Sequence, residues 1–355
     1  MSSGRRQDHV VACRTRGGAQ TIVTCAVTCA AVCATACSSS GPPGSDDEPN
    51  RLSIATGTTS GIYYPVGGAM SEIINGEIDG LSASVEATGA SVENMRLLGR
   101  GDSDLAIAQG DVVYQAYHAN GEFTGDAIES QSLMVLYPNV YHAVSLASVH
   151  ADIGLDCFGD IAGHRFSVGA AGSGNELATN LVFDALDLSP ESDITREQYA
   201  YADTARALLE GEIEAGSWVV GEEHASLSEL EATSPIHLIP VCDDEREQVT
   251  RRHPFYRTHT IRAGTYATVE HDVLTIALWN VVAVSPEMSE ERGYELAKTL
   301  YENVDAISQV YDSGARYLTL ASLRNSPVPL HPGLVRYAEE QGFTVPEELK
   351  PGTGG

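Results

Sequence analysis

The feature that most constrains the fold is a repeating unit made of a short apolar strand, a glycine-containing loop and an amphipathic helix. The first unit starts at residues 52–55, where a β-like run is followed by glycines and then by apolar residues at helical spacing. The unit recurs at residues 81–98 and again at residues 105–117. Three such units in succession predict a parallel sheet with helices packed on its faces.

A second set of units follows a long apolar run at residues 133–147, which Pro138 interrupts. Helices are predicted after Gly172 and at residues 203–209. The strands of this set are predicted at residues 166–168, 217–220 and 237–241. The set indicates a second α/β lobe.

The C-terminal part of the chain is predicted to return to the first lobe. A buried-strand run at residues 278–284 precedes amphipathic helical patterns at residues 287–311 and 332–340. Two strands that cross between the lobes, near residues 140 and 282, would form a hinge.

The length of the chain allows this arrangement. Its 355 residues exceed one typical domain and permit two lobes, each with its own apolar core. Hydrophobic residues make up 43% of the chain, and 34 residues are glycine, which is the composition of a folded soluble protein. We expect lobe 1 to comprise residues 51–141 and 285–355, and lobe 2 to comprise residues 142–284.

The charge balance argues against nucleic-acid partners. Against 49 acidic residues there are only 21 Lys and Arg, which gives a net charge of −28. A field of this sign repels polyphosphates and anionic lipid headgroups. The acidic surface fits an adaptation to high salt, and it equally fits an ordinary soluble surface encoded by a GC-rich genome that prefers Arg to Lys.

The N-terminal segment has the pattern of an export signal. Residues 1–21 carry four arginines, and residues 22–36 form an uncharged stretch. This stretch is shorter than the span of about 20 apolar residues that a membrane helix requires. The pair Arg5-Arg6 hints at twin-arginine export, although the residues after it do not fit the usual motif.

The uncharged stretch ends in a sequence that resembles a lipobox, Ala34-Thr35-Ala36-Cys37. We predict a lipoprotein signal peptide at residues 1–37, with Cys37 as the lipidated residue that becomes the mature N-terminus. A polar tether at residues 38–50 follows. Ordinary cleavage by a signal peptidase and a retained membrane anchor are the alternatives.

Two cysteines remain after Cys37, namely Cys157 and Cys242. An even pair in an exported chain is compatible with a disulfide. Two buried free thiols are the other possibility, and the sequence slightly favours them.

The loop at residues 56–61 is the first candidate ligand site, because open α/β sheets bind ligands between a strand and the following helix. Its Thr58 and Ser60 hydroxyls lie beside helix N–H groups that can receive an anion without a basic side chain. Tyr63 and Tyr64 follow and offer an apolar face and a hydroxyl. The same residues also fit a simple turn in which Ser60 caps the helix.

The end of the third strand supplies the next candidate. Gln109 is expected to point its amide toward the cleft, whereas Asp111 is better explained as the N-cap of the following helix.

The loop at residues 169–176 is a second candidate anion site, from the other lobe, and it contains Ser173, Gly174 and Asn175. It does not match the dinucleotide, P-loop or nucleophile-elbow motifs. No pairing of His with an acidic residue has the spacing of a metal site. The sequence therefore predicts neither metal nor cofactor, and it disfavours an enzyme.

Taken in their order along the chain, these loops resemble those of the receptor subunits of tripartite ATP-independent periplasmic (TRAP) transporters, specifically of the TAXI branch. The resemblance runs through most of residues 51–310 and is carried by Thr56-Gly57 to Gly68, Ala87 to Asn94, Asp104 to Gln109, Val168 to Gly174, Leu209 to Ala215, and Ile261 to Tyr266.

This resemblance implies an α/β, type II periplasmic-binding-protein fold with a ligand cleft between two lobes. It implies a monomeric receptor outside the cell membrane, a membrane permease partner driven by an ion gradient, and a small carboxylate ligand such as glutamate, glutamine or 2-oxoglutarate. Carried over to this sequence, the expected ligand-binding residues are Thr58, Ser60, Tyr63, Tyr64, Gln109, Ser173, Gly174 and Asn175, with Trp218 as a wall of the cleft.

Two other functions stay open at the level of sequence. A sensor subunit that reports to a membrane kinase would have the same cleft. An exported hydrolase would use Ser173, and it would need a histidine within hydrogen-bond reach of that hydroxyl.

Overall fold

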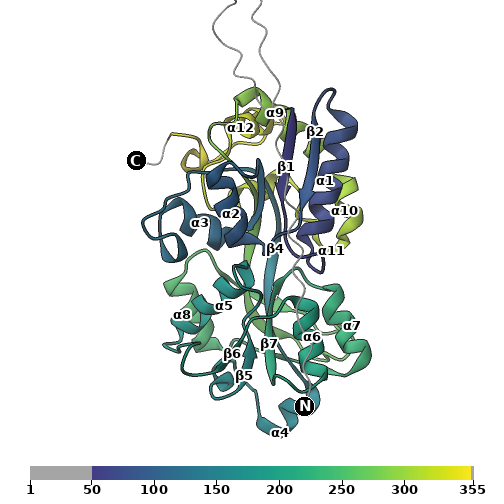
Figure 1. Cartoon of the computed structure of the whole chain (residues 1–355), viewed down its shortest axis with the longest axis vertical. Helices are drawn as coiled ribbons and strands as arrows, with labels where there is room; N and C mark the ends of the chain where they lie inside the picture. The colour runs from purple at the N-terminus through teal and green to yellow at the C-terminus, as the bar shows by residue number, and fades with distance from the viewer. Residues whose placement is uncertain (1–49, 353–355) are drawn as a thin grey trace, which may run out of the picture. The chain divides into compact units, whose positions relative to one another are not determined.

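One mixed β-sheet runs through both lobes of the protein, with the strands of the first lobe at one end and those of the second lobe at the other. The computed structural model describes residues 50–352, so the predicted signal peptide, the tether up to residue 49 and the lipidation of Cys37 lie outside the described residues. In the described part the sheet has ten strands, and its main path runs β2-β1-β3-β10-β4-β7-β5-β6. Figure 1 shows the two groups of elements, with β4 running from one to the other.

The first lobe is built on three parallel strands, each followed by a helix. β1 lies between β2 and β3, and it pairs with both in the parallel direction that the repeating units predict. The strands are β1 (Arg51–Ala55), β2 (Ser82–Glu86) and β3 (Leu105–Gln109), and the helices are α1 (Tyr63–Glu77), α2 (Ser91–Arg100) and α3 (Gly110–Tyr117).

The second lobe repeats this order. β5 lies between β6 and β7, and all three run parallel. The strands of the lobe are β5 (Arg165–Ser167), β6 (Thr195–Glu197), β7 (Ala215–Val220), β8 (Ile236–Ile239) and β9 (Arg257–Ile261). The helices are α4 (Ala147–Ile153), α5 (Gly174–Ala185), α6 (Tyr201–Leu209), α7 (Ala225–Thr233) and α8 (Asp243–Arg252).

Two long antiparallel strands join the lobes. β4 (Gln131–Leu146) continues into the second lobe and pairs with β7, and β10 (Val273–Val284) returns and pairs with β3. Pro138 does not end β4 as its sequence suggested. It pairs with Trp279 beside a register shift in β10, a place where a residue without an N–H is tolerated.

The C-terminal helices pack on the first lobe, where α10 lies beside α1 and α12 lies beside α9 (Figure 1). The helical pattern at residues 287–311 forms two α-helices, because α9 ends at Glu302 and α10 starts at Val304. The elements are α9 (Glu290–Glu302), α10 (Val304–Val310), α11 (Asp312–Ala315) and α12 (Pro332–Glu340), and short 3₁₀ turns lie at Gly121–Phe123, Phe158–Ile161, Leu320–Asn325 and Glu347–Leu349.

Side chains alternate between the two faces of each strand, and they therefore contribute to hydrophobic cores on both faces of the sheet. Neighbouring residues of β7 serve different clusters of the second lobe, with Val219 in one and Trp218 in the other. The first lobe has its own cluster, which includes Ile54 of β1 and Ile107 of β3. The chain thus forms two α/β lobes joined by two strands, which confirms the predicted fold class.

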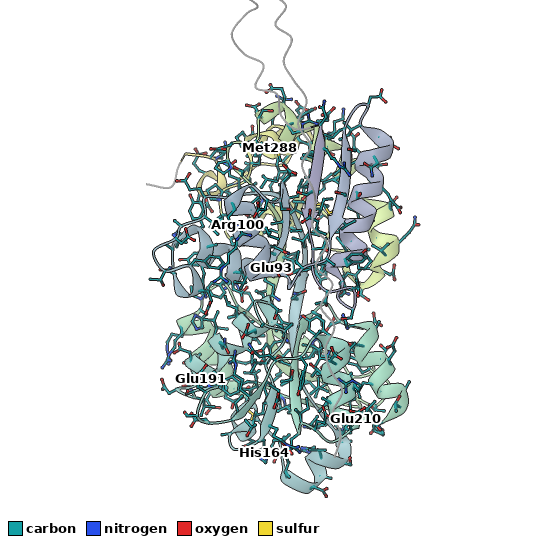
Figure 2. All side chains as sticks on the ribbon, viewed as in Figure 1. Glu93, Arg100, His164, Glu191, Glu210 and Met288 are labelled. Atoms are coloured by element: carbon teal, nitrogen blue, oxygen red, sulfur yellow. A yellow bond between two sulfur atoms is a disulfide. The ribbon has the colours of Figure 1, made fainter. Side chains whose placement is uncertain are left out.

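Acidic side chains are spread over both lobes. Figure 2 shows Glu93 on the first lobe and Glu191 and Glu210 on the second, and all three are exposed. None of the helices in residues 50–352 has the length and apolar character that crossing a membrane would require.

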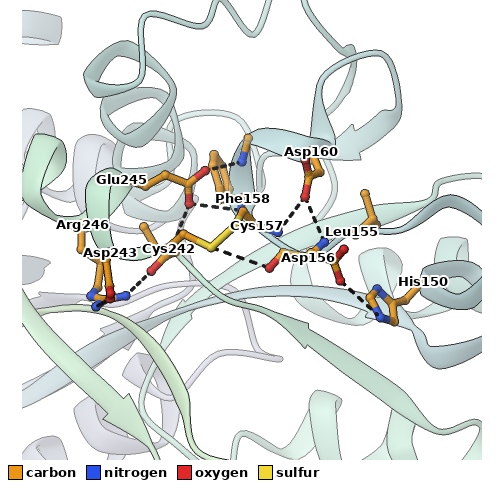
Figure 3. The surroundings of a disulfide bond; sticks show 12 residues. His150, Leu155, Asp156, Cys157, Phe158, Asp160, Cys242, Asp243, Glu245 and Arg246 are labelled. Carbon is orange, nitrogen blue, oxygen red and sulfur yellow. Dashed lines mark hydrogen bonds and ion pairs between the residues drawn. A yellow bond between two sulfur atoms is a disulfide. The ribbon is translucent and has the colours of Figure 1, made fainter.

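A disulfide joins Cys157 to Cys242 in the second lobe, so the slightly favoured prediction of two free thiols is wrong. The pairing depends on tertiary structure, which brings the Cα atoms within 5.5 Å across 85 residues of sequence. Glu245 reinforces the junction by accepting the backbone N–H groups of Gly159 and Cys242, both at 2.7 Å. Figure 3 shows this arrangement, which ties the start of α8 to the turn at Phe158–Ile161.

Candidate ligand-binding site

A cavity of about 40 Å³ lies where the loops of the two lobes meet. From the first lobe it is lined by the loops after β1, β2 and β3, and from the second lobe by the loops after β5 and β6 and by the end of β7. This is the edge of an open α/β sheet where ligands bind. The space exceeds the roughly 10–15 Å³ that one water molecule requires.

Five helices begin at the cavity. Their N-cap residues all line it, and they are Ile62 of α1, Ala90 of α2, Gln109 of α3, Ser173 of α5 and Ala200 of α6. A helix N-terminus carries a partial positive charge and N–H groups without intrahelical partners. Five of them around one cavity create a site that favours negative charge.

Most of these N-cap residues do not cap their helix with their own side chain. Only Ser173 caps its own helix, since its Oγ accepts the N–H of Glu176 at 3.0 Å. The other four N-caps make no such side-chain hydrogen bond. Ala90 also has a φ of 79°, which is strained for a residue with a Cβ and is typical of functional loops.

No ionisable acid or base lines the cavity in the described part of the chain: none of the lining residues is Asp, Glu, Lys, Arg or His. The site therefore combines helix dipoles with neutral hydroxyl and amide groups. Among the described residues, the side chains that line the cavity thus offer an anion neither a countercharge nor a carboxylate.

Three buried polar atoms of lining residues have no hydrogen-bond partner within residues 50–352: Gln109 Oε1, Tyr137 OH and Asn175 Oδ1. The orientation of both amides is set by their NH₂ groups. Gln109 Nε2 donates to the carbonyl of Val219 at 3.3 Å, and Asn175 Nδ2 donates to the carbonyl of Ser217 at 2.9 Å. Since a carbonyl can only accept, the amide oxygens are the unpaired atoms. Each buried unpaired polar atom costs about 1–3 kcal/mol.

A network of neutral groups holds the walls of the cavity. Tyr63 OH donates to Asn280 Oδ1 at 2.5 Å, and Asn280 Nδ2 donates to Asn139 Oδ1 at 2.7 Å. The carbonyl of Val219 accepts from both Asn139 Nδ2 and Tyr201 OH. Burial raises the pKa of Tyr63 well above its ordinary value, so the network stays uncharged.

The structure brings together six of the predicted ligand residues. Those that line the cavity are Thr58, Tyr63, Gln109, Ser173, Gly174 and Asn175. Ser60 does not line it, and it does not cap α1; its hydroxyl lies 3.2 Å from Thr58 Oγ1.

Trp218 and Tyr64 do not line the cavity either. Trp218 is fully buried in the core of the second lobe, where its Nε1 donates to Ser226 Oγ at 3.0 Å. The alternation along β7 turns it away while the next residues, Val219 and Val220, line the cavity. Tyr64 is 37% exposed on the outside of α1.

The predicted N-cap role of Asp111 is also wrong. Gln109 holds the N-cap position of α3, and Asp111 lies one residue inside the helix, fully buried. β3 ends at Gln109 and α3 begins at the very next residue, Gly110, so the N-cap position falls on Gln109.

Sequence reasoning missed several lining residues. Ala90 and Ser91 belong to a motif that was recognised but not assigned to the site, while Tyr137 and Asn139 lie inside the crossing strand. The lining residues at the start of α6, which include Tyr201, could have been found from the sequence, because they follow a strand and open a helix.

Two α/β lobes, two connecting strands and a cavity between the lobes define the class of proteins with the two-lobed, type II periplasmic-binding-protein fold. Within this class, the chain belongs to the NMT1-like family, whose model matches residues 54–342.

Solved structures match this chain at low sequence identity. A protein from Bordetella bronchiseptica RB50 is 13% identical with a TM-score of 0.50, over 84% of this chain and 86% of that one. The periplasmic aliphatic sulphonate binding protein SsuA from Escherichia coli is 12% identical with a TM-score of 0.39, over 84% and 80% of the two chains. PhnD1 from Prochlorococcus marinus, in complex with methylphosphonate, is 11% identical with a TM-score of 0.46, over 75% and 90%.

Proposed function

We propose that this protein is an extracytoplasmic receptor that captures a small anionic solute between its lobes and delivers it to a membrane transporter. The observation that carries the proposal is the cavity itself, where five helix N-termini meet and no lining side chain is charged. Helix dipoles stabilise an anion there even though the whole chain has a net charge of −28.

The proposed ligand is a small carboxylate such as glutamate, glutamine or 2-oxoglutarate. The unpaired oxygens of Gln109 and Asn175 accept hydrogen bonds and do not donate them. A ligand with an ammonium group would satisfy them, whereas a keto group would not. Within the proposed set, this favours glutamate and glutamine over 2-oxoglutarate.

Capture would follow from closure of the lobes. Only when the lobes meet can the loops after β1 and β5 contact the same ligand, so the ligand stabilises the closed state. Each charge-assisted contact contributes about 1.5–3 kcal/mol. A few such contacts account for micromolar affinity, which corresponds to about 8 kcal/mol.

The proposed location is the outer face of the cell membrane, with Cys37 as the lipid anchor. The disulfide between Cys157 and Cys242 fits an oxidising compartment. The proposed partner is the permease of a TRAP transporter. A kinase-coupled sensor would share the cleft, and a permease gene or a kinase gene beside this one would distinguish the two roles.

The receptor role is preferred to the exported hydrolase. The Ser173 hydroxyl caps α5, and no histidine within residues 50–352 forms a hydrogen bond with it. Ser173 therefore lacks the general base that a nucleophilic serine requires.

A thermal-shift screen of the purified protein tests the proposal. Its ligands are glutamate, glutamine and 2-oxoglutarate, with glutarate, an aliphatic sulphonate and methylphosphonate for comparison, at low and high salt. We expect one carboxylate to raise the melting temperature, and Gln109→Ala to reduce the shift. If a folded protein freed of carried-over ligand gives no shift with any of these acids, the carboxylate receptor is wrong. A shift with the sulphonate or the phosphonate alone would keep a receptor but change its ligand class.

A further inference from the structure

A buried carboxyl group connects the two lobes at a place that the proposed ligand site does not use. Asp111, in the first turn of α3, accepts a hydrogen bond from Tyr256 OH at 2.7 Å. The next residues of α3, Val112 and Val113, belong to the core of the first lobe, whereas Tyr256 belongs to a core cluster of the second. Asp111 is 0% and Tyr256 is 1% exposed.

A second contact joins the same two segments. The rings of Tyr114 in α3 and Phe255 lie 5.6 Å apart, centroid to centroid. The face of α3 thus rests on the segment that leads into β9. Movement of the lobes away from each other would break both contacts and expose Asp111 to water.

The groups facing Asp111 are uncharged at neutral pH. They are Tyr256, Tyr63 of α1 and, behind Tyr256, Tyr141 of β4 and His253. Burial lowers the pKa of His253 below its ordinary value, so this ring is neutral as well.

The ionised groups on the elements around α3 have partners elsewhere. β3 and β10 carry no charged residue. On α2, the turn after α3 and α5, the acids pair as follows: Glu93 with the N–H of Gly89, Glu122 with Arg96, Glu176 with Arg196, and Asp184 with Arg252.

We propose that closure of the lobes is linked to proton uptake by Asp111, so that the protein closes more readily as the pH falls. The proposal rests on the proposed capture between two lobes, and it holds for whichever solute is bound. When the lobes are apart, Asp111 is hydrated and ionised. When they meet, the carboxyl enters an apolar contact in which its protonated form is stabler.

The sign and size of the effect follow from linkage. Burial raises the pKa of Asp111 from 3.8 to about 7, although the hydrogen bonds from Tyr256 and the Val112 N–H act against the rise. The closed state therefore binds more protons between these two values. The ratio of closed to open protein should fall about 20-fold between pH 5.5 and pH 7.5. It should not depend on pH well above the higher pKa or well below the lower one.

The test is a distance measurement between spin labels on the two lobes, without ligand, across this pH range. Cysteines at the exposed positions Glu122 and Glu191 carry the labels. We expect the closed population to fall with rising pH, and Asp111→Asn to remove the dependence and keep the closed population high at pH 7.5. Asp126→Asn, at an exposed position of the first lobe, is the matched control and should behave as the parent protein.

Tyr256→Phe gives a second readout. It removes a hydrogen bond that stabilises ionised Asp111, so the pH range of the transition should extend upward. A pH profile that is flat in the parent protein, or unchanged in Asp111→Asn, overturns the proposal. Because no ligand is present, that result would leave the receptor function standing, and a failed ligand screen would leave this measurement intact.

Discussion

Gln109 Nε2 donates a hydrogen bond to the carbonyl oxygen of Val219 at 3.3 Å, and this bond connects the first lobe to the second. On the same side, the backbone N–H of Glu93 donates to the carbonyl of Gly172. Gln109 and Val219 line the cavity, and Gly172 directly precedes the lining residue Ser173. The lobes are therefore joined where the proposed ligand binds, and substitutions at the junction should change affinity more than stability.

Gly174→Ala should block the meeting of the lobes. A Cβ at this position would lie 2.7 Å from both Gln109 Cδ and Ser91 Oγ, which belong to the other lobe. We expect ligand affinity to fall at least about tenfold (1.4 kcal/mol), with little change in melting temperature. Calorimetric titration of both proteins with the ligand found in the screen measures the change in affinity.

Gly68→Ala is the control for this substitution. Gly68 lies within α1, and a Cβ there meets nothing within 4 Å. Alanine should stabilise the helix by up to about 1 kcal/mol and leave affinity unchanged. Equal losses of affinity in both variants would contradict the proposed steric block.

Removal of the disulfide should destabilise the second lobe. The bond closes a loop across 85 residues, so the double variant Cys157→Ser, Cys242→Ser should lose about 2–5 kcal/mol of unfolding free energy. Denaturant titration of the two proteins checks this. A loss under about 0.5 kcal/mol would mean that the Glu245 contacts alone hold the junction.

Tyr311→Phe should weaken capture from the opposite edge of the cleft. Tyr311 OH donates to the carbonyl of Glu222 at 3.2 Å, which links the C-terminal part of the first lobe to the second. Loss of one such bond should reduce affinity about two- to tenfold. Tyr294→Phe is the control, because Tyr294 OH donates to Glu340 within the first lobe. The two variants should differ in affinity, and equal affinities would argue that the bond does not favour closure.

His142 should make the fold sensitive to acid. Burial lowers the pKa of His142 from 6.5 to about 4, so the unfolded chain takes up a proton in this range and the folded chain does not. Stability should be complete above about pH 6.5 and should fall by about 3 kcal/mol as the pH drops to about 4. Denaturant titrations at several pH values measure this change. The unfolding free energy should depend less steeply on pH in His142→Asn than in the parent protein.

The exposed His271 supplies the control for that slope, because His271→Asn should leave it unchanged. Asp111 contributes a slope of the opposite sign in the same range, since its pKa is raised by burial. The comparison is therefore between matched variants, and identical slopes in the parent and His142→Asn would contradict the prediction.

The units of strand, loop and helix were visible in the sequence because each is local. Apolar spacing located β1, α1, β3 and α5, and the glycine loops at residues 56–61 and 169–176 contribute residues that line the cavity. The sequence-based predictions were wrong where a single residue set the end of a strand or the start of a helix. Pro138 lies within β4, and Gln109 takes the N-cap position that Asp111 was expected to hold.

The sequence by itself determined the α/β class, the two lobes and most of the loops that meet at the cavity, since periodicity and turn residues act over short stretches of chain. Only the tertiary structure decided which side chains face the cavity. The alternation of side chains along β7 turned Trp218 into the core, and the packing of strands and helices left Gln109, Tyr137 and Asn175 with unpaired oxygens beside the cavity. It also joined Cys157 to Cys242 and placed Asp111 against Tyr256. These pairs are distant in sequence, and only the packing of the two lobes brings them together.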